Sequence, residues 1–230
     1  MDRMLITGGC GFVGSSLAIN FRRRYPQLKI ACLDNLRRRG SELNVARLKP
    51  WAVEFVHGDI RSQEDLYGVG DVDVILECSA EPSVLAGYNS SPDYVVGTNL
   101  VGTINCLELA RRMTHSVTFI FLSTSRVYPI KTINRLNIEE TATRFELSDE
   151  QTVPGVSRNG LSEQFPLEGV RSLYGATKLA SELILQEYVD IYGIKGIINR
   201  CGVLTGPWQF GKVDQGVIVH WVARHFWRQR

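Results

Sequence analysis

A tyrosine and a lysine stand four residues apart in the segment Tyr174-Gly175-Ala176-Thr177-Lys178. On a helix this spacing places the phenol and the ammonium group on one face, within reach of a common ligand. A free tyrosine, with a pKa of about 10, is a poor base at neutral pH, but a nearby positive charge favours its phenolate form. The pair therefore predicts a base that takes a proton from a hydroxyl group. The alternative is an exposed aromatic and lysine pair, which helices often carry.

A glycine-rich turn follows the first apolar run, with glycines at Gly8, Gly11 and Gly14. Such a turn between a strand and a helix lets a pyrophosphate approach the N–H groups at the helix N-terminus. Asp34 lies 20 residues past Gly14, where a carboxylate accepts hydrogen bonds from the ribose of a dinucleotide. We therefore predict an NAD site, because this carboxylate repels the 2′-phosphate of NADP. An ordinary strand-to-helix turn is the alternative reading of the glycines.

Arginines beside Asp34 keep NADP open as a second cofactor. Arg37 and Arg38 follow the acidic residue closely, and arginines at this place hold a 2′-phosphate in some dinucleotide sites. Further along the chain, Thr124 ends a β-rich run just after Ser123. A hydroxyl at the carboxyl end of such a strand lies where open α/β sheets bind ligands, although it can equally cap a turn.

Six short apolar runs alternate with segments of helical length, and they cover residues 4–7, 30–33, 53–56, 72–76, 117–122 and 196–198. This alternation predicts an α/β fold with a doubly wound parallel sheet and helices on both faces. One helix is expected over 93–113, with an apolar stripe of Val96, Leu100, Ile104 and Leu107. A second is expected over 174–192, ending at Gly193, with the inward positions Leu179, Leu183, Tyr188 and Ile191.

The composition of the 230 residues excludes several classes of protein. With 44% hydrophobic positions the chain can bury a core without disulfides or metals, and its net charge of +2 argues against nucleic-acid or membrane partners. Its five cysteines are scattered, without a C-x-x-C pair, which indicates reduced thiols and a cytoplasmic protein. Neither the cysteines nor the four histidines have the spacing of metal ligands, so no metal is expected.

Taken together, these motifs resemble the extended short-chain dehydrogenase/reductase superfamily, which has a Rossmann-type fold. Within it they resemble the NAD-dependent nucleotide-sugar epimerases and dehydratases. The resemblance extends to about Gly216, and its matching segments are residues 7–14, 34–36, 58–61, 99–105, 124 and 174–178. It implies a nucleotide-sugar substrate and catalytic roles for Thr124, Tyr174 and Lys178. The cofactor contacts that it implies are Gly8, Gly11, Phe12, Val13, Gly14, Asp34, Asn35, Arg37, Asp59, Ile60, Ser79, Ala80, Asn99, Ser123, Tyr174, Lys178 and Val203.

The family's chemistry implies a mechanism for these residues. Tyr174 takes the proton of a sugar hydroxyl, held by Thr124 and tuned by Lys178, while NAD takes hydride from the same carbon. The keto intermediate is then reduced on its other face, which inverts the carbon and regenerates NAD. Dehydratases of the family follow the threonine with an Asp-Glu pair that serves elimination, whereas this chain has Ser125 and Arg126. A 4,6-dehydratase is therefore disfavoured.

Finer features resemble the CDP-paratose 2-epimerase group, which acts at C2 of a CDP-dideoxyhexose. They are the segments 34–40, 56–61, 134–136, 143–147, 172–178 and 200–207, together with Glu140 and the 50-residue spacing from Thr124 to Tyr174. A C4 epimerase or a reductase of another nucleotide sugar, and a non-catalytic NAD-binding fragment, stay open. Three positions depart from the family pattern: Val203 replaces an asparagine, Glu77 a histidine, and Glu81 an amide.

The resemblance also implies an organisation in two parts. Residues 1–200 form the NAD-binding domain, including a long irregular loop over 128–171, and residues 201–230 begin a truncated substrate lobe. Trp208 would border the sugar pocket and stack on the substrate, unless it is a core aromatic. The helices over 93–113 and 174–192 would pair across a dimer axis, which predicts a homo-oligomer, either a dimer or a tetramer. The last residues, 225–230, are expected to lie in the middle of a helix.

Overall fold

The computed structural model describes residues 2–211 and 215–229, and its centre is a six-stranded sheet in the order β10-β5-β4-β1-β2-β3. Every neighbouring pair in this sheet is parallel. The strands are β1 (Arg3–Thr7), β2 (Lys29–Asp34), β3 (Glu54–His57), β4 (Val74–Glu77), β5 (Thr118–Thr124) and β10 (Lys195–Cys201). Each overlaps one of the six predicted runs, so the doubly wound parallel sheet is confirmed.

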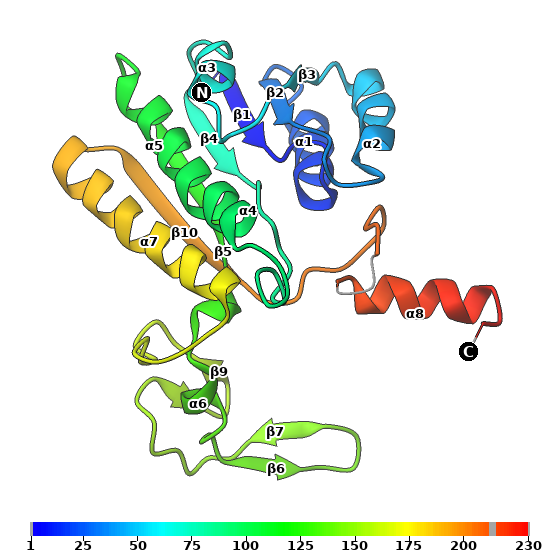
Figure 1. Cartoon of the computed structure of the whole chain (residues 1–230), viewed down its shortest axis with the longest axis vertical. Helices are drawn as coiled ribbons and strands as arrows, with labels where there is room; N and C mark the ends of the chain where they lie inside the picture. Colours follow the sequence, from blue (N-terminus) through cyan, green and yellow to red (C-terminus); the bar gives the residue numbers. More distant parts are fainter. Residues whose placement is uncertain (1, 212–214, 230) are drawn as a thin grey trace.

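Helices cover both faces of the sheet (Figure 1). On one face lie α1 (Phe12–Arg24) and α2 (Ser41–Leu48), and on the other lie α3 (Gln63–Tyr67), α4 (Asp93–Val96), α5 (Gly102–Arg112) and α7 (Leu173–Tyr192). Successive residues of β1 supply the two cores: Leu5 packs toward α5 and α7, while Met4 and Ile6 pack toward α1. Short 3₁₀ turns complete the framework at η1 (Lys49–Trp51) and η3 (Ser125–Val127).

The strand order reverses between β1 and β4, which sends the connections after these strands to opposite faces. In open α/β sheets ligands bind in the crevice outside the carboxyl ends of the strands at such a point. The glycine-rich turn follows β1, and the segment 78–83 follows β4. The glycine-rich turn and the segment 78–83 therefore lie at the same edge of the sheet.

The predicted helix over 93–113 is present, but a π-helical turn, η2 (Gly97–Val101), interrupts it. The predicted stripe is only partly right, because Val96, Leu100 and Ile104 are half-buried. The buried positions include Val95, Asn99, Thr103, Cys106 and Ala110, and Leu107 is buried as predicted. The buried stripe is offset by one residue from the predicted one already at Val95, before the π turn begins.

Helix α7 confirms the predicted bounds, with the Ser172 hydroxyl accepting the N–H of Gly175 at one end and Gly193 at φ +68° at the other. The predicted inward face is wrong for Leu183, which is 55% exposed, and for Ile191, which is 62% exposed, while Leu179 and Tyr188 are half-buried. The fully buried positions are Gly175, Thr177, Lys178, Ser181, Glu182 and Leu185. This helix therefore lays its more polar side on the sheet.

Hydrogen-bond and ion-pair partners on the sheet and on η2 stabilise the burial of this polar side of α7. The Arg200 guanidinium forms an ion pair of 2.7 Å with Glu182, whose side chain is fully buried. Ser123 donates its hydroxyl proton to the same carboxylate. Ser181 donates to the backbone carbonyl of Asn99 at 2.9 Å. Because each of these buried polar groups has a partner, the cost of removing it from water is offset.

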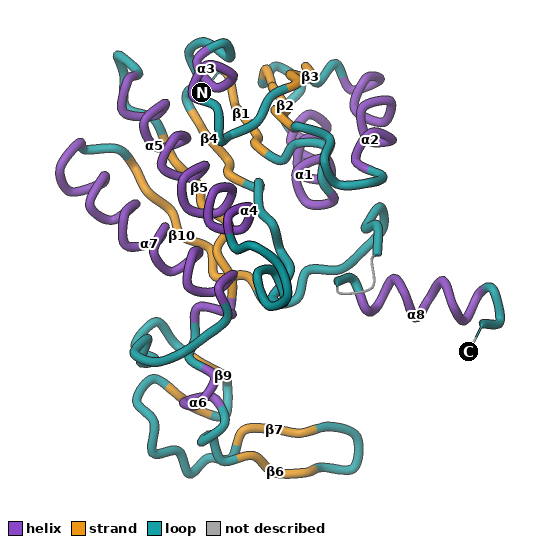
Figure 2. The backbone as a smooth tube through the Cα atoms, in the orientation of Figure 1, coloured by secondary structure: helices purple, strands orange, loops and turns teal. Residues whose placement is uncertain are grey.

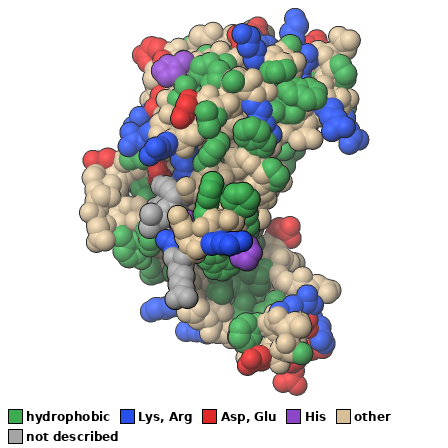
Figure 3. Space-filling model, turned by 90° about the vertical axis from the view of Figure 1, so that its right-hand side faces the viewer, with side chains coloured by type: hydrophobic (Ala, Val, Ile, Leu, Met, Phe, Trp, Pro, Cys, Tyr) green, Lys and Arg blue, Asp and Glu red, His purple; other side chains and the backbone are tan. Residues whose placement is uncertain are grey.

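The long loop predicted over 128–171 leaves the sheet as an arm (Figures 1 and 2). It contains α6 (Ile130–Ile133) and two small hairpins, β6 (Ile138–Glu140) with β7 (Phe145–Leu147) and β8 (Val156–Ser157) with β9 (Gly160–Leu161). In the space-filling view the arm lies below the sheet and exposes both acidic and basic side chains (Figure 3).

Helix α8 (Val217–Phe226) lies apart from the sheet at the C-terminal side (Figure 1). It exposes Trp221 at 62% and Phe226 at 73%. The expectation that residues 225–230 lie within a helix is wrong for 227–229, because α8 ends at Phe226, and Arg230 lies outside the described residues. No helix in the described ranges combines the length and the apolar character needed to cross a membrane.

Replacing Gly14 by alanine is expected to destabilise the fold. A Cβ at this position would lie 2.4 Å from the carbonyl oxygen of Gly8 and 2.9 Å from the Cα of Gly9, which are backbone atoms of the turn. Overpacking of this kind costs about 1–3 kcal/mol. Urea denaturation should show that loss for Gly14→Ala and little change for Gly202→Ala, since a Cβ at Gly202 meets no atom within 4 Å. Equal losses in both variants would contradict the proposed steric role of the turn.

Candidate active site

The turn after β1 presents the start of α1 to solvent at the strand ends. Gly8 adopts φ +62°, and its carbonyl accepts the N–H of Gly11 at 2.9 Å. Helix α1 begins at Phe12 with no capping side chain and no acidic residue in its first turn. The N–H groups of Phe12 and Val13 have no acceptor within the helix, so they are suited to bind an anion. The turn therefore fits the pyrophosphate of a dinucleotide.

Asp34 ends β2 beside this turn and is 9% exposed. One carboxylate oxygen accepts the N–H of Cys10 at 3.0 Å, and the other accepts the N–H of Leu36 at 2.8 Å. Burial raises the pKa of Asp34, and these backbone hydrogen bonds oppose the rise. The backbone N–H of Gly11 is a third donor to this carboxylate, which leaves about one of its roughly four lone pairs for the predicted hydrogen bond to a ribose hydroxyl.

A second acidic group, Asp59, lies next to Asn35. The Asn35 amide donates to Asp59 at 2.8 Å, and Arg61 forms an ion pair with it at 2.7 Å. Burial raises the pKa of Asp59, but the hydrogen bonds from Arg61 and Asn35 outweigh it and lower the pKa to about 2. The Arg37 guanidinium lies 3.9 Å from the ring centroid of Tyr94. Asn35 and Asp59 are thus joined by a hydrogen bond, and Arg37 and Arg61 both lie over the Tyr94 ring; their contacts with a cofactor and the preference for NAD over NADP stay predictions.

The segment after β4 closes over the glycine turn. A Cβ at Gly8 would lie 2.8 Å from the backbone nitrogen of Ser79, and Ser79 and Ala80 are half-buried. Asn99 is fully buried and fixes this segment by accepting the N–H of Glu81 at 2.8 Å and donating to its carbonyl at 3.1 Å. The side chain of Asn99 therefore shapes the wall of the site.

Three other predicted cofactor residues have different surroundings. Ile60 is 3% exposed and packs beneath Gly102, where a Cβ would lie 2.5 Å from its Cδ1. The Ser123 hydroxyl is used by Glu182. Val203 follows β10 and is 77% exposed. Whether these three touch a cofactor stays a prediction.

Thr124 and Tyr174 come together at the carboxyl end of β5. The Thr124 hydroxyl is hydrogen-bonded to the Tyr174 phenol, and its oxygen also accepts the N–H of Arg126 at 3.1 Å. Burial raises the pKa of Tyr174, and the hydrogen bond from Thr124 opposes this rise. The two hydroxyl groups can together hold a hydroxyl of a ligand, as predicted.

Lys178 lies beneath them on α7 and is 2% exposed. Its Nζ lies 4.3 Å from the ring centroid of Phe121 on β5. The charges that bear on the pKa of Tyr174 are those of Cys201, Arg126 and Glu77. The predicted lowering of the pKa of Tyr174 by Lys178 therefore stays a prediction.

Trp208 lies in the segment between β10 and α8, with a left-handed backbone at φ +70°. Its ring is 4.6 Å from the Arg47 guanidinium, and the residue is 47% exposed, so it is not a core aromatic. The same segment reaches Phe12 through Gly206 and the N-terminus of α2 through Phe210, whose ring lies against Gly40. Stacking of Trp208 on a substrate stays a prediction.

Glu77, which the sequence analysis noted only as replacing a histidine of the family, was not predicted as a site residue. It ends β4 and is fully buried, with one carboxyl oxygen 3.3 Å from the Thr103 hydroxyl. Burial raises its pKa to about 7, against the opposing effects of Lys178 and Thr103. The sequence signal was an acidic side chain at the end of the apolar strand Val74–Glu77, where a buried carboxyl group is rare.

This raised pKa predicts that the stability of the protein depends on pH. The folded state binds a proton at Glu77 more tightly than the unfolded chain, in which the pKa is near the ordinary 4.5. The stabilisation is therefore complete below about pH 4.5, and it is lost as the pH rises to about 7, by about 3 kcal/mol. Urea denaturation across this range should show a decline in wild type that Glu77→Gln removes and the exposed-site variant Glu187→Gln keeps. The same decline in Glu77→Gln would refute this assignment.

Comparisons with known proteins agree with this geometry. The model of the family described as "NAD dependent epimerase/dehydratase family" matches residues 4–226. The CDP-paratose 2-epimerase of Salmonella typhi is 32% identical over 217 residues, covering 93% of this chain and 61% of that protein. The dTDP-glucose 4,6-dehydratase of Mycobacterium tuberculosis is 29% identical over 208 residues, covering 90% of this chain and 55% of that protein.

Solved structures show the same fold. The UDP-glucose 4-epimerase of Thermus thermophilus, in complex with NAD, superposes with a TM-score of 0.74 at 26% identity, covering 99% of this chain and 63% of that one. The dTDP-glucose 4,6-dehydratase of Bacillus anthracis, in complex with NAD, has a TM-score of 0.72 at 25% identity, covering 100% of this chain and 63% of that one. The chain thus spans about 60% of the length of these relatives. It belongs to the NAD dependent epimerase/dehydratase family.

Proposed function

We propose that this chain binds NAD and carries the catalytic residues of a nucleotide-sugar epimerase. The observation that carries the proposal is the hydroxyl pair of Thr124 and Tyr174, which lies at the carboxyl edge of the sheet above the buried Lys178. The glycine turn and Asp34 end the neighbouring strands β1 and β2 at the same edge. A dinucleotide held there extends along the edge toward the hydroxyl pair.

The residues of the chain have separate tasks in this mechanism. Bound NAD supplies an acceptor for hydride that can return it. Thr124 donates a hydrogen bond to the oxygen of the sugar hydroxyl, and the phenolate of Tyr174 takes that hydroxyl's proton as the C–H bond breaks. The proton goes back from Tyr174 when the carbon is reduced on its opposite face. Burial raises the pKa of Tyr174 in the protein alone, so the positive charges of Lys178 and of the nicotinamide must favour the phenolate.

Among the nucleotide sugars, we favour a CDP-dideoxyhexose that is epimerised at C2. The similarity to the CDP-paratose 2-epimerase over 93% of the chain supports this choice. A 4,6-dehydratase is disfavoured because Ser125 and Arg126 follow Thr124, and neither side chain is an acid for eliminating water. The residues at the site would serve a C4 epimerase equally well.

The exposed side of α7 supports a homo-oligomer, and the cysteines support a cytoplasmic location. The outer side of α7 exposes Leu183 and Ile191, beside α5. A second copy that covers this side would make a homo-oligomer. All five cysteines are free, in agreement with a reducing cytoplasm.

Incubation with CDP-paratose tests the reaction itself. NMR of the sugar should show inversion at C2 only when NAD is present, without accumulation of NADH. Accumulating NADH would instead identify a dehydrogenase, and NAD-dependent thermal stabilisation without any change in the sugar would identify a cofactor-binding module.

Tyr174→Phe tests the assignment of the base. Losing the phenolic oxygen should lower turnover by at least about 100-fold, the contribution of a positioned acid or base. NAD binding, measured by calorimetry, should stay within a few-fold of wild type. Tyr192→Phe, at an exposed position near the other end of the same helix, serves as the control and should keep full turnover. Full turnover in Tyr174→Phe would remove the residue from the mechanism.

A further inference from the structure

Glu77 lies directly beneath the catalytic pair, between the sheet and its helices. In the sheet it pairs with Thr7 of β1 on one side and with Phe121 of β5 on the other. From above, Thr103 of α5 is in hydrogen-bond contact with its carboxyl group. Lys178 of α7 lies over the ring of Phe121. The carboxyl group is thus enclosed at the strand ends where the reaction is proposed to occur.

The surroundings of Glu77 do not compensate a full negative charge. One carboxyl oxygen contacts the Thr103 hydroxyl at 3.3 Å, and the other is buried without a hydrogen-bond partner among the described residues. Glu182, the other fully buried glutamate of the described chain, has both Arg200 and Ser123 as donors. Since an unpaired buried charge is costly, the two glutamates differ in their donors, and Glu77 is able to hold a proton.

The charge of Glu77 acts on both catalytic side chains. The positive charge of Lys178 favours ionised Glu77 and lowers its pKa. Ionised Glu77 in turn raises the pKa of Tyr174. Under the proposed function, in which Lys178 favours the Tyr174 phenolate, a negative charge at Glu77 opposes that effect.

The thiol groups near Glu77 and Tyr174 are neutral near pH 7. Cys106 on α5 and Cys78 after β4 face Glu77, and burial raises the pKa of both thiols. Cys201 on β10 bears on Tyr174, and burial raises its pKa as well. Arg126 is the remaining charge that bears on Tyr174, and it lowers the pKa of that residue. Of the described groups, Lys178 is thus the cation whose charge reaches Glu77.

We propose that Glu77 is a positioning residue that controls the base: while its carboxyl group holds a proton, the field of Lys178 is free to favour the Tyr174 phenolate, and when the carboxyl group ionises, Tyr174 keeps its proton. The proposal rests on the proposed function, in which Tyr174 is the base. It involves no proton passing between the two side chains. The coupling makes their titrations interdependent.

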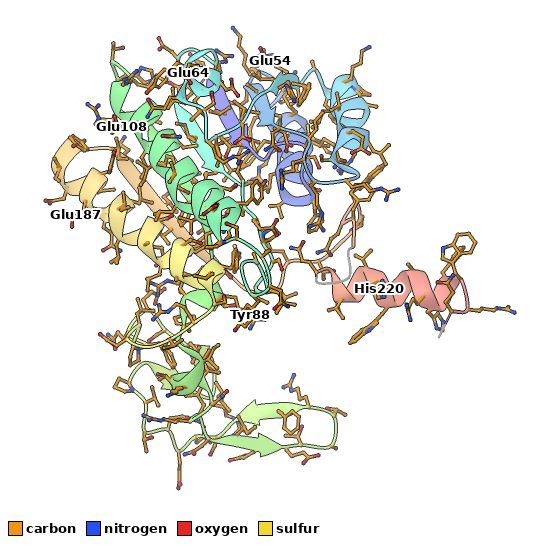
Figure 4. All side chains as sticks on the ribbon, in the orientation of Figure 1. Glu54, Glu64, Tyr88, Glu108, Glu187 and His220 are labelled. Atoms are coloured by element: carbon orange, nitrogen blue, oxygen red, sulfur yellow. The ribbon has the colours of Figure 1, made fainter. Side chains whose placement is uncertain are left out.

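Titration of the Tyr174 phenol tests this control without substrate or cofactor. The phenolate of Tyr174 is followed by near-ultraviolet difference spectra, subtracting Tyr174→Phe in the same background to remove the other tyrosines. In Glu77→Gln, which cannot ionise, the midpoint should fall by roughly one pH unit, because a negative neighbour has been removed. Glu187→Gln, which changes an exposed glutamate that projects outward from α7 (Figure 4), should leave the midpoint unchanged. An unchanged midpoint in Glu77→Gln would overturn the proposal.

A second measurement follows Glu77 itself and stays decisive if Glu77→Gln fails to fold. Infrared difference spectra of the wild-type chain should show a protonated carboxyl band that disappears as the pH rises through about 7. Lys178→Met should move this transition to higher pH, because the cation that favours ionised Glu77 is gone. No such band in the wild type, or a transition that Lys178→Met leaves in place, would overturn the proposal. Both titrations can succeed in a chain that turns over no sugar, so a failure of the proposed reaction is distinguishable from a failure of this coupling.

Discussion

The structure depends on the way helix α7 lies on the sheet, with charged and hydroxyl side chains facing inward. Such packing needs partners for its buried charges, because an unpaired ion in the interior costs several kcal/mol. Glu182 meets Arg200 and Ser123, and this ion pair joins α7 to both β10 and β5. One turn earlier on the same helix stands Lys178. The positions of Tyr174 and Lys178 thus follow from the ion pair that Glu182 forms one turn away.

The same requirement explains how much of the chain could be predicted from its sequence. The strands and the glycine turn were predictable because buried parallel strands are continuously apolar and a phosphate-binding turn needs glycine at fixed positions. The face of α7 was not predictable, since Leu183 and Ile191 have the period of a buried stripe and yet are exposed. The residues that hold the polar side of α7 against the sheet are Ser123 and Arg200. Both lie outside this helix in the sequence, so no local pattern predicts these pairs. The π turn at Gly97–Val101 was not predicted either, because its formation depends on packing.

At the site, residue types were more predictable than their tasks. Asp34, Thr124 and Tyr174 lie where their motifs predicted. Asn99 instead uses its amide to hold the backbone of Glu81. Glu77 had no motif, because its effect arises only when a strand end, Lys178 and the absence of compensating donors among the described residues coincide. Such electrostatic environments become visible only in three dimensions.

The arm between Thr124 and Tyr174 begins and ends at nearly one point. The N–H of Ile130 donates to the carbonyl of Val170 at 3.1 Å, and a Cβ at Gly175 would lie 2.2 Å from the carbonyl oxygen of Arg126. Because the arm is closed at its base in this way, its length does not change the distance between Thr124 and Tyr174. Insertions or deletions within the arm therefore leave the arrangement of these two hydroxyl groups unchanged.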